Sequence, residues 1–168
     1  MSNAFATLAE LFRYPEASPD PTQVTLNDDA RLEFDEFARE IAALDRHELQ
    51  AAYTSTFDLA PSCSPYLGTH LFGAAGVERG RLLAGLRAGY ARAGIDFDQR
   101  EVPDHVAEVL AFAAHEETEE WSDLVRLILV PALTKMDALV RPTSNPYRHL
   151  IAAARQTSEA ASCRGGSQ

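Results

Sequence analysis

The sequence predicts an all-α protein, a single-domain bundle of about seven helices. Ala, Leu, Glu and Arg are frequent among the 168 residues, whereas Val, Ile and Thr are sparse, and that balance favours helix over sheet. Apolar residues recur at helical intervals, without the alternation of strands. Hydrophobic residues make up 46% of the chain, which is enough for one sizeable core.

Local signals place the first three helices. Tyr14-Pro15 should end a first helix, and the prolines of residues 15–27 indicate a loop. A second helix should begin at Asn27 or Asp28, because either residue can cap it. Its apolar stripe is Ala30, Phe34, Phe37, Ile41 and Leu44. Asp45 and Glu48 have the spacing of a capping box and should open the third helix.

The remaining helices follow an irregular segment, residues 59–76, which is long enough to be either functional or partly helical. A fourth helix covers residues 77–93 and stops at Gly94. Pro103 suits the first turn of a fifth helix, and Pro131 should kink or divide a sixth helix over residues 117–140. Asn145-Pro146 starts the seventh. We therefore expect a helical domain over residues 1–155 and a disordered tail over residues 156–168.

Charge and hydropathy narrow the class of partner. The formal net charge is -10, from 15 basic and 25 acidic residues, so nucleic acid is not an expected partner. An acidic surface suits a basic peptide, although solubility alone is the simpler explanation of the charge. The N-terminus lacks the pattern of a signal peptide, and the longest apolar run, Leu127–Leu133, is too short to span a membrane. We expect a cytoplasmic protein that does not insert into membranes.

No catalytic set emerges from the sequence. Asp104-His105, with Glu101 and Glu108 nearby, could form an acid-base pair, but a structural or binding role at the expected helix start, where aspartate is favoured, explains these residues better. His70 and Cys63 give no recognised zinc spacing. The glycines after residue 72 lack the strand and the lysine of a phosphate loop. We expect no enzymatic activity, no cofactor and no metal site.

Large apolar residues beside flexible backbone suggest a peptide groove instead. Helical spacing makes core packing the simplest explanation for these residues, but a Gly/Pro-broken segment with large apolar groups also suits an adaptable binding surface. The set comprises Tyr53, Phe57, Tyr66, Leu67, Leu71 and Phe72.

Five strings of residues occur in an order that resembles a known family. They are YTSTFD (53–58), HLFG (70–73), ERGRLLAGL (78–86), REVPDHVAEVLAF (100–112) and NPYRHLIAAA (145–154). The set resembles the NarJ branch of the TorD-like chaperones, also called nitrate reductase delta subunits or redox-enzyme maturation proteins. The likeness covers most of residues 5–155. The segment SCSPYLGTHLFG (62–73) looks closer to chaperones that serve dimethyl sulfide, ethylbenzene, selenate or chlorate enzymes.

The resemblance implies a non-enzymatic chaperone for a molybdenum enzyme. Such a chaperone would bind the N-terminal segment of the apo catalytic subunit, which carries molybdenum-bis(guanine dinucleotide) when mature. It would keep that subunit competent for cofactor insertion and would delay export where a twin-arginine signal exists. Two alternatives stay open at this point: a permanent accessory subunit of the reductase, and a nucleotide hydrolase. A monomer is expected, with a domain-swapped dimer as an alternative that the loop over residues 59–76 permits.

The expected peptide-binding residues combine the apolar set with the motif before the fifth helix. Apolar side chains of the client would enter a cleft walled by Tyr53, Phe57, Leu71 and Phe72, and acidic groups at its rim would meet client arginines. The full expected set is Tyr53, Phe57, Tyr66, Leu67, His70, Leu71, Phe72, Glu101, Pro103, Asp104, His105 and Glu108.

Overall fold

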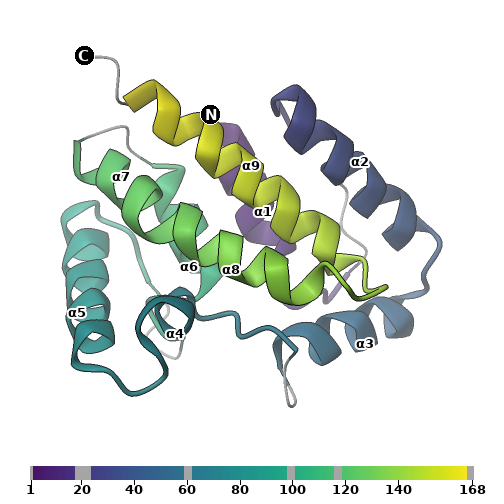
Figure 1. Cartoon of the computed structure of the whole chain (residues 1–168), viewed down its shortest axis with the longest axis horizontal. Coiled ribbons are helices and arrows are strands. Elements are labelled where there is room, and N and C mark those ends of the chain that lie inside the picture. The colour runs from purple at the N-terminus through teal and green to yellow at the C-terminus, as the bar shows by residue number, and fades with distance from the viewer. Residues whose placement is uncertain (1, 18–23, 59–61, 98–100, 116–118, 166–168) are drawn as a thin grey trace.

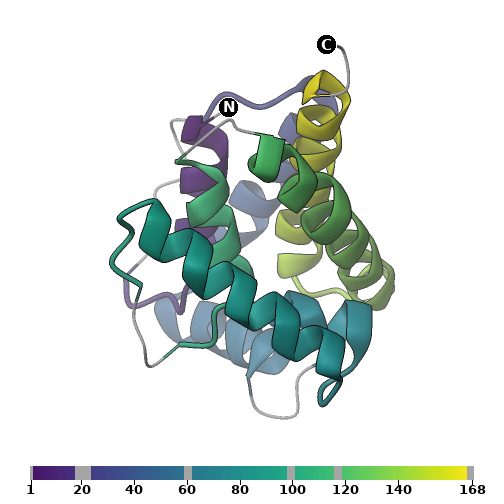
Figure 2. The ribbon, with the colours of Figure 1, turned by 90° about the vertical axis from the view of Figure 1, so that its left-hand side faces the viewer.

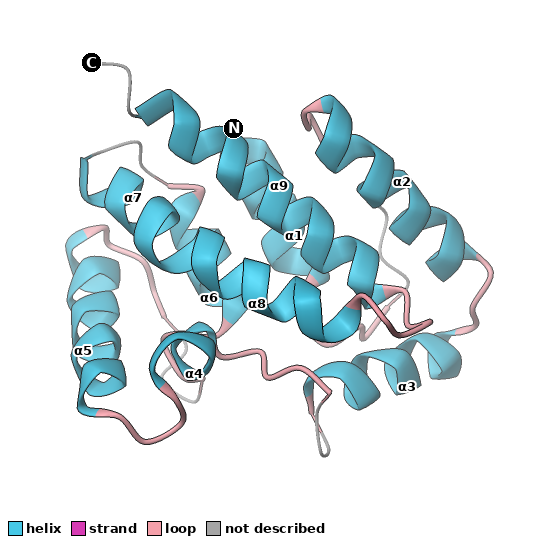
Figure 3. Ribbon diagram, viewed as in Figure 1, coloured by secondary structure: helices cyan, strands magenta, loops and turns pink. Residues whose placement is uncertain are grey.

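The computed structural model describes residues 2–17, 24–58, 62–97, 101–115 and 119–165. Within these ranges the regular structure is helical, and the only extended pairing is an isolated bridge between Tyr66 and His105 (Figure 3). The all-α prediction is confirmed. The elements are α1 (Ser2–Leu11), α2 (Asp28–Ala42), α3 (Arg46–Phe57), α4 (Leu67–Phe72), α5 (Val77–Arg92), α6 (Val106–Ala113), α7 (Glu119–Leu124), the π-helical turn η1 (Val125–Leu129), α8 (Val130–Val140) and α9 (Tyr147–Gly165).

The bundle is organised around α9, which runs beside α8 and has α2 on its other side (Figure 1). It also contacts α1, which packs in turn against α6. Ala152, Ala153 and Ala154 are fully buried, and their small side chains let neighbouring helices approach α9 closely. The packing thus gives α9 buried surface on several sides.

The helix-start signals in the first half of the chain are confirmed. Asn27 caps α2, with its Oδ1 accepting a hydrogen bond from the backbone N–H of Ala30 at 2.9 Å. Asp45 and Glu48 form the expected capping box at the start of α3, with reciprocal hydrogen bonds of 2.9 and 2.8 Å. Each cap satisfies backbone donors that a helix start leaves unpaired.

Gly94 ends α5 as predicted. Its φ is +67°, and the N–H of Ile95 donates to the carbonyl of Tyr90 at 3.0 Å in the Schellman arrangement. The segment before α5 is partly helical, because it contains the short helix α4.

The prediction for Pro103 is wrong: α6 begins later, at Val106, with His105 as its N-cap. Pro103 lies in the preceding turn, and its carbonyl accepts a hydrogen bond from Tyr90 Oη at 2.7 Å.

Pro131 divides the long helix that the sequence predicts over residues 117–140. The backbone before it widens into η1, where the N–H of Val130 donates to the carbonyl of Val125, five residues back. Proline lacks the N–H needed for the α-helical ladder, and a π turn is a common way to absorb such an interruption. The result is three consecutive segments, α7, η1 and α8.

The C-terminal part of the chain differs from the prediction of a disordered tail after residue 155. Helix α9 continues to Gly165, and Thr157, Ser158 and Ala161 are buried in the bundle. The two hydroxyls donate to carbonyls one turn earlier, at 2.7 and 2.8 Å, so these polar side chains are buried without loss of hydrogen bonds. No helix in the described part of the chain has both the length and the apolar character needed to cross a membrane.

Candidate functional site

Tyr53 and Phe57 belong to an aromatic cluster in the core. Their ring centroids lie 5.1 Å apart, and each ring packs against Tyr147 at the start of α9, at 5.6 and 5.3 Å. Tyr53 Oη donates to the carbonyl of Phe12 at 3.2 Å, and burial raises the pKa of this phenol to about 12. Phe57 is buried, so it does not wall the expected groove.

The expected residues of α4 face different surroundings. Leu67 is fully buried, whereas Leu71 and His70 are half-buried and Phe72 is exposed. His70 Nε2 lies 2.8 Å from the carbonyl of Ser64, so the imidazole bonds to the loop that precedes α4. The structure therefore does not bring Leu71 and Phe72 together with Tyr53 and Phe57 in one cleft.

Asp104 forms a buried junction between three helices instead of a rim. Its side chain is 0% exposed, and its two oxygens accept hydrogen bonds from Arg79 of α5 at 2.9 and 3.1 Å. Oδ2 also accepts from the backbone N–H of Gly68 in α4 at 3.1 Å. A Cβ at Gly68 would lie 2.7 Å from that same oxygen, so a larger residue at this position would clash with the Asp104 side chain. Both oxygens of Asp104 are thus already engaged within the fold, and we correct its expected rim position.

Four of the expected residues do meet, in a cleft of about 610 Å³ between the end of α1 and the start of α6. They are Tyr53, Glu101, His105 and Glu108. Tyr66 lies beside this cleft, with its ring 5.7 Å from that of His105. The tyrosine is half-buried, and desolvation together with Glu101 raises its pKa. We refer to this depression as the acidic cleft.

An ion pair crosses the acidic cleft. Arg13, in the turn after α1, places Nη1 2.6 Å from Oε1 of Glu108 in the first turn of α6. The arginine also lies 3.4 Å from Glu10. Burial opposes the charge of Arg13, but the bond to Glu108 and the nearby carboxylates outweigh it, so the pKa of the guanidinium is raised. This pair connects α1 to α6.

His105 is a neutral imidazole in this environment. Its Nδ1 accepts a hydrogen bond from the backbone N–H of Ala107 at 3.2 Å, so that nitrogen carries no proton. Burial lowers the pKa of His105 in spite of the nearby Glu101 and Glu108. The single ring proton therefore resides on Nε2.

A second depression is apolar and involves residues outside the expected site. It has a volume of about 430 Å³ and lies between α5 and the α7–η1 segment. Figure 2 shows α5 crossing the front of the molecule, with α7 and α8 beyond it. Its apolar lining is Leu82, Leu86, Phe112, Trp121, Leu124, Leu127 and Ile128. We refer to this depression as the apolar groove.

Sequence reasoning missed this groove because periodicity assigns Leu82 and Trp121 to helix faces without saying what covers those faces. One available signal was Leu127, which falls outside the stripe of its helix and is exposed at the groove. Another was Gly85 with Gly89, one turn apart on α5. A Cβ at Gly89 would lie 3.1 Å from the ring of Phe112, whereas a Cβ at Gly85 would point into open space.

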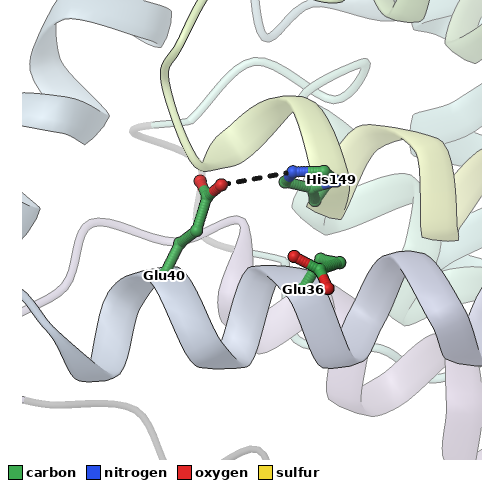
Figure 4. Close-up of side chains that lie close together, drawn as sticks. All are labelled: Glu36, Glu40 and His149. Atoms are coloured by element: carbon green, nitrogen blue, oxygen red, sulfur yellow. Dashed lines mark ion pairs between the residues drawn. The ribbon is translucent and has the colours of Figure 1, made fainter.

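Glu36, Glu40 and His149 form a further cluster, where α2 faces α9 (Figure 4). One potential ligand atom from each lies within 4.8 Å of the others. Arginines already balance the carboxylates: Arg39 contacts Glu36, and Arg148 lies 2.7 Å from Glu40. His149 Nε2 lies 3.5 Å from Glu40. We assign this cluster to an ion-pair network that joins the two helices.

The structure defines the class of protein as a helical bundle with two separate depressions on its described surface. The acidic cleft lies at the start of α6, and the apolar groove includes Phe112 near the end of that helix. A model of the nitrate reductase delta subunit family matches residues 25–153. This match covers most of the chain, and the chain belongs to that family. The family assignment expected from the ordered strings is confirmed.

Curated relatives agree with the family match. The chain is 28% identical over 115 residues to the nitrate reductase molybdenum cofactor assembly chaperone NarJ of Escherichia coli strain K12. The protein of the same description from Escherichia coli O157:H7 gives the same identity. In both cases the matched region is 68% of this chain and 48% of the relative. The chain therefore spans about half the length of the curated relatives it matches.

Proposed function

We propose that this protein is a cytoplasmic, non-enzymatic chaperone for assembly of a molybdenum enzyme of the nitrate reductase type or a related type. It would bind the N-terminal segment of the apo catalytic subunit and keep that subunit competent for cofactor insertion. Membership of the nitrate reductase delta subunit family supports this proposal, as does the description of the NarJ relatives as molybdenum cofactor assembly chaperones.

The apolar groove is the observation that carries the proposal. An amphipathic helix or extended segment can place apolar side chains in a groove between two helices, as in helix-in-groove recognition. The walls come from α5 and from α7–η1, so the groove runs between elements and its volume of about 430 Å³ suits several side chains. The carboxylates at its edge already have partners within the chain: Glu120 pairs with Arg92 at 3.0 Å, and Asp123 pairs with Arg126 at 2.7 Å. The apolar lining is therefore what favours a bound segment.

A matched pair of leucines tests the groove. Leu127 lines it and is 51% exposed, whereas Leu139 of α8 is 52% exposed and lies outside its lining. Burying a leucine against a bound peptide contributes about 1.5 kcal/mol or more, which is about tenfold in Kd. Leu127→Ser should weaken binding by about that factor, and Leu139→Ser should leave binding unchanged, with both variants folded.

The assay is calorimetry with a synthetic peptide that has the N-terminal sequence of the apo catalytic subunit from the same organism. Saturable binding by the unmodified chain supports the proposal, and equal Kd values for the two serine variants would remove the groove from it.

Copurification distinguishes a chaperone from a permanent subunit. A chaperone should accompany the apo catalytic subunit and be absent from the mature reductase, whereas an accessory subunit should remain in both.

A further inference from the structure

We propose that α5 is a movable wall of the apolar groove, which rolls about one fastened edge and thereby opens the groove to a bound segment. The inference rests on the proposed function only for the identity of that segment. The movement itself is argued from the way in which α5 is attached to the bundle. Helix α5 stands at one side of the molecule and packs most closely against the short helix α4 (Figure 1).

One edge of α5 is fastened to the turn before α6. The guanidinium of Arg79 donates to the carboxylate of Asp104 at 2.9 and 3.1 Å. The hydroxyl of Tyr90 donates to the carbonyl of Pro103 at 2.7 Å. Arg79 and Tyr90 lie about three helical turns apart, so they are on the same side of α5. Both ends of this edge are thus bonded to two consecutive residues, and the line between them is an axis about which the helix can roll.

The opposite edge of α5 is held by an exposed ion pair, which we call the clasp. Arg92 lies roughly 140–160° around the helix from Arg79 and Tyr90. Its Nη2 lies 3.0 Å from Oε2 of Glu120 in α7, and both residues line the groove. Their side chains are 62% and 80% exposed. Water screens such a pair, so the clasp holds the two walls together only weakly.

The helix has few contacts with the facing wall between these two edges. Within the described residues, α5 does not pack closely against α7 or η1. Gly85 is exposed and lines the groove, and a Cβ at this position would meet nothing within 4 Å. Side chains of α5 therefore do not fill the volume of about 430 Å³. Because dispersion contacts require close approach, the free edge loses few of them when it moves.

The connections at both ends of α5 can absorb such a movement. Gly73 before the helix has a φ of +80°, and Gly94 after it has a φ of +67°. A Cβ at either glycine would meet nothing within 4 Å, so surrounding side chains do not clamp the chain at these points. Hinges are commonly a few residues at the ends of elements that take up changes in backbone angle. Helix α5 can thus roll without breaking its own helical hydrogen bonds.

The facing wall is fixed to the bundle, which makes its tryptophan a reporter of the movement. Trp121, the single tryptophan of the chain, is 9% exposed and lines the groove. Its Nε1 donates to the carbonyl of Ala113 at 2.6 Å, and its indole packs edge-on against Phe5 of α1 at 6.1 Å. When the free edge of α5 lifts, the indole stays with the bundle and becomes accessible to solutes that enter the groove.

Acrylamide quenching of the Trp121 fluorescence tests the movement in the free chain. Arg92→Gln opens the clasp, so it should raise the quenching constant by about twofold, the population shift expected from loss of an exposed ion pair. Arg126→Gln is the matched control, because it breaks an exposed pair within one wall and should leave the quenching constant unchanged. Equal constants for Arg92→Gln and the unmodified chain, with both folded, would overturn the proposal.

Cross-linking of the clasp tests whether the movement admits a segment. Arg92→Cys and Glu120→Cys are joined by a bismaleimide whose spacer contains a disulfide. A Cys163→Ser background leaves the buried Cys63 as the other thiol. The cross-linked chain should have a lower quenching constant than the unmodified chain. It should also associate about tenfold more slowly with the synthetic N-terminal peptide of the catalytic subunit, because the required movement is blocked.

Reduction of the spacer should restore both the quenching constant and the association rate. Asp123→Cys with Arg126→Cys is the control for the reagent, since it takes the same cross-link within one wall and should show neither effect. An association rate that the cross-link between the walls does not alter would overturn the proposal.

The outcome separates this inference from the proposed function. If the catalytic-subunit peptide does not bind, the proposed function fails, and the quenching of Arg92→Gln and of the cross-linked chain decides whether α5 moves. If the peptide associates equally fast with the cross-linked and the reduced chain, the proposed function stands and the movable wall fails.

Discussion

The buried pair of Asp104 and Arg79 gives the sharpest prediction for stability. Asp104→Asn keeps the shape of the side chain but removes its charge, so Arg79 loses its ionic partner while its side chain is 16% exposed. Breaking a buried ion pair from one side costs about 3–5 kcal/mol, and the partial access of water to Arg79 places the effect at the lower end, at about 3 kcal/mol. For a chain of this size that corresponds to a fall in Tm of about 6–12 °C.

The assay is urea and thermal unfolding of both single variants and the double variant. Arg79→Gln should also destabilise strongly, because it leaves a buried carboxylate, and the double variant should be less destabilised than the sum by about 2 kcal/mol. Asp123→Asn, at an exposed pair, is the control and should change stability by less than about 1 kcal/mol. A loss below about 1 kcal/mol for Asp104→Asn, or strict additivity, would refute this reasoning. If Asp104→Asn instead lowers the affinity for the peptide without changing the free energy of unfolding, Asp104 has a binding role.

Three further predictions concern packing, pH and thiol reactivity. Gly68→Ala should destabilise by about 2 kcal/mol, because its Cβ would meet Asp104 at 2.7 Å. Gly80→Ala, in open space within α5, should instead stabilise by about 0.5–1 kcal/mol in the same unfolding assay. The pKa of His105 is lowered in the folded chain, so below the ordinary histidine pKa the unfolded chain binds more protons. The free energy of unfolding should therefore rise with pH through that window, and His105→Asn should reduce the slope; an unchanged slope would contradict the assignment. A thiol reagent at pH 8 should modify the exposed Cys163 quickly and the buried Cys63, whose pKa is raised to about 12, only after unfolding, as mass spectrometry of the labelled peptides would show.

Local signals in the sequence account for the helix boundaries that were predicted correctly. A capping side chain at Asn27 or Asp45 and a left-handed glycine at Gly94 act through bonds to residues a few positions away. Such bonds depend on short stretches of sequence, so the residues alone indicate them. Pro131 belongs to the same group, because its effect on the helix ladder is also local.

The roles of the site residues depend on long-range packing that the sequence does not display. Asp104 has the pattern of a helix start, but its partner Arg79 lies 25 positions earlier on another helix. Tyr53 and Phe57 look suitable for a groove, yet Tyr147, from the far end of the chain, covers both rings. Glu101, His105 and Glu108 do line one recess together with Tyr53, but its walls differ from those of the expected groove, and a role in peptide binding stays a prediction.

The π turn η1 has a consequence for how this helix tolerates changes in length. A π turn contains one residue more than an α-helical turn, so deletion of one residue between Val125 and Leu129 could close it into regular helix. Each residue of an α-helix turns the chain by about 100°, so an extra residue placed in regular helix would rotate α7 by that angle relative to α8. The wider turn takes up the extra residue instead, and Trp121 of α7 keeps its contact with Phe5 and its place at the groove. The π turn thus preserves the rotational phase between the half of the helix that is anchored in the core and the half that lines the groove, although the chain carries one residue more.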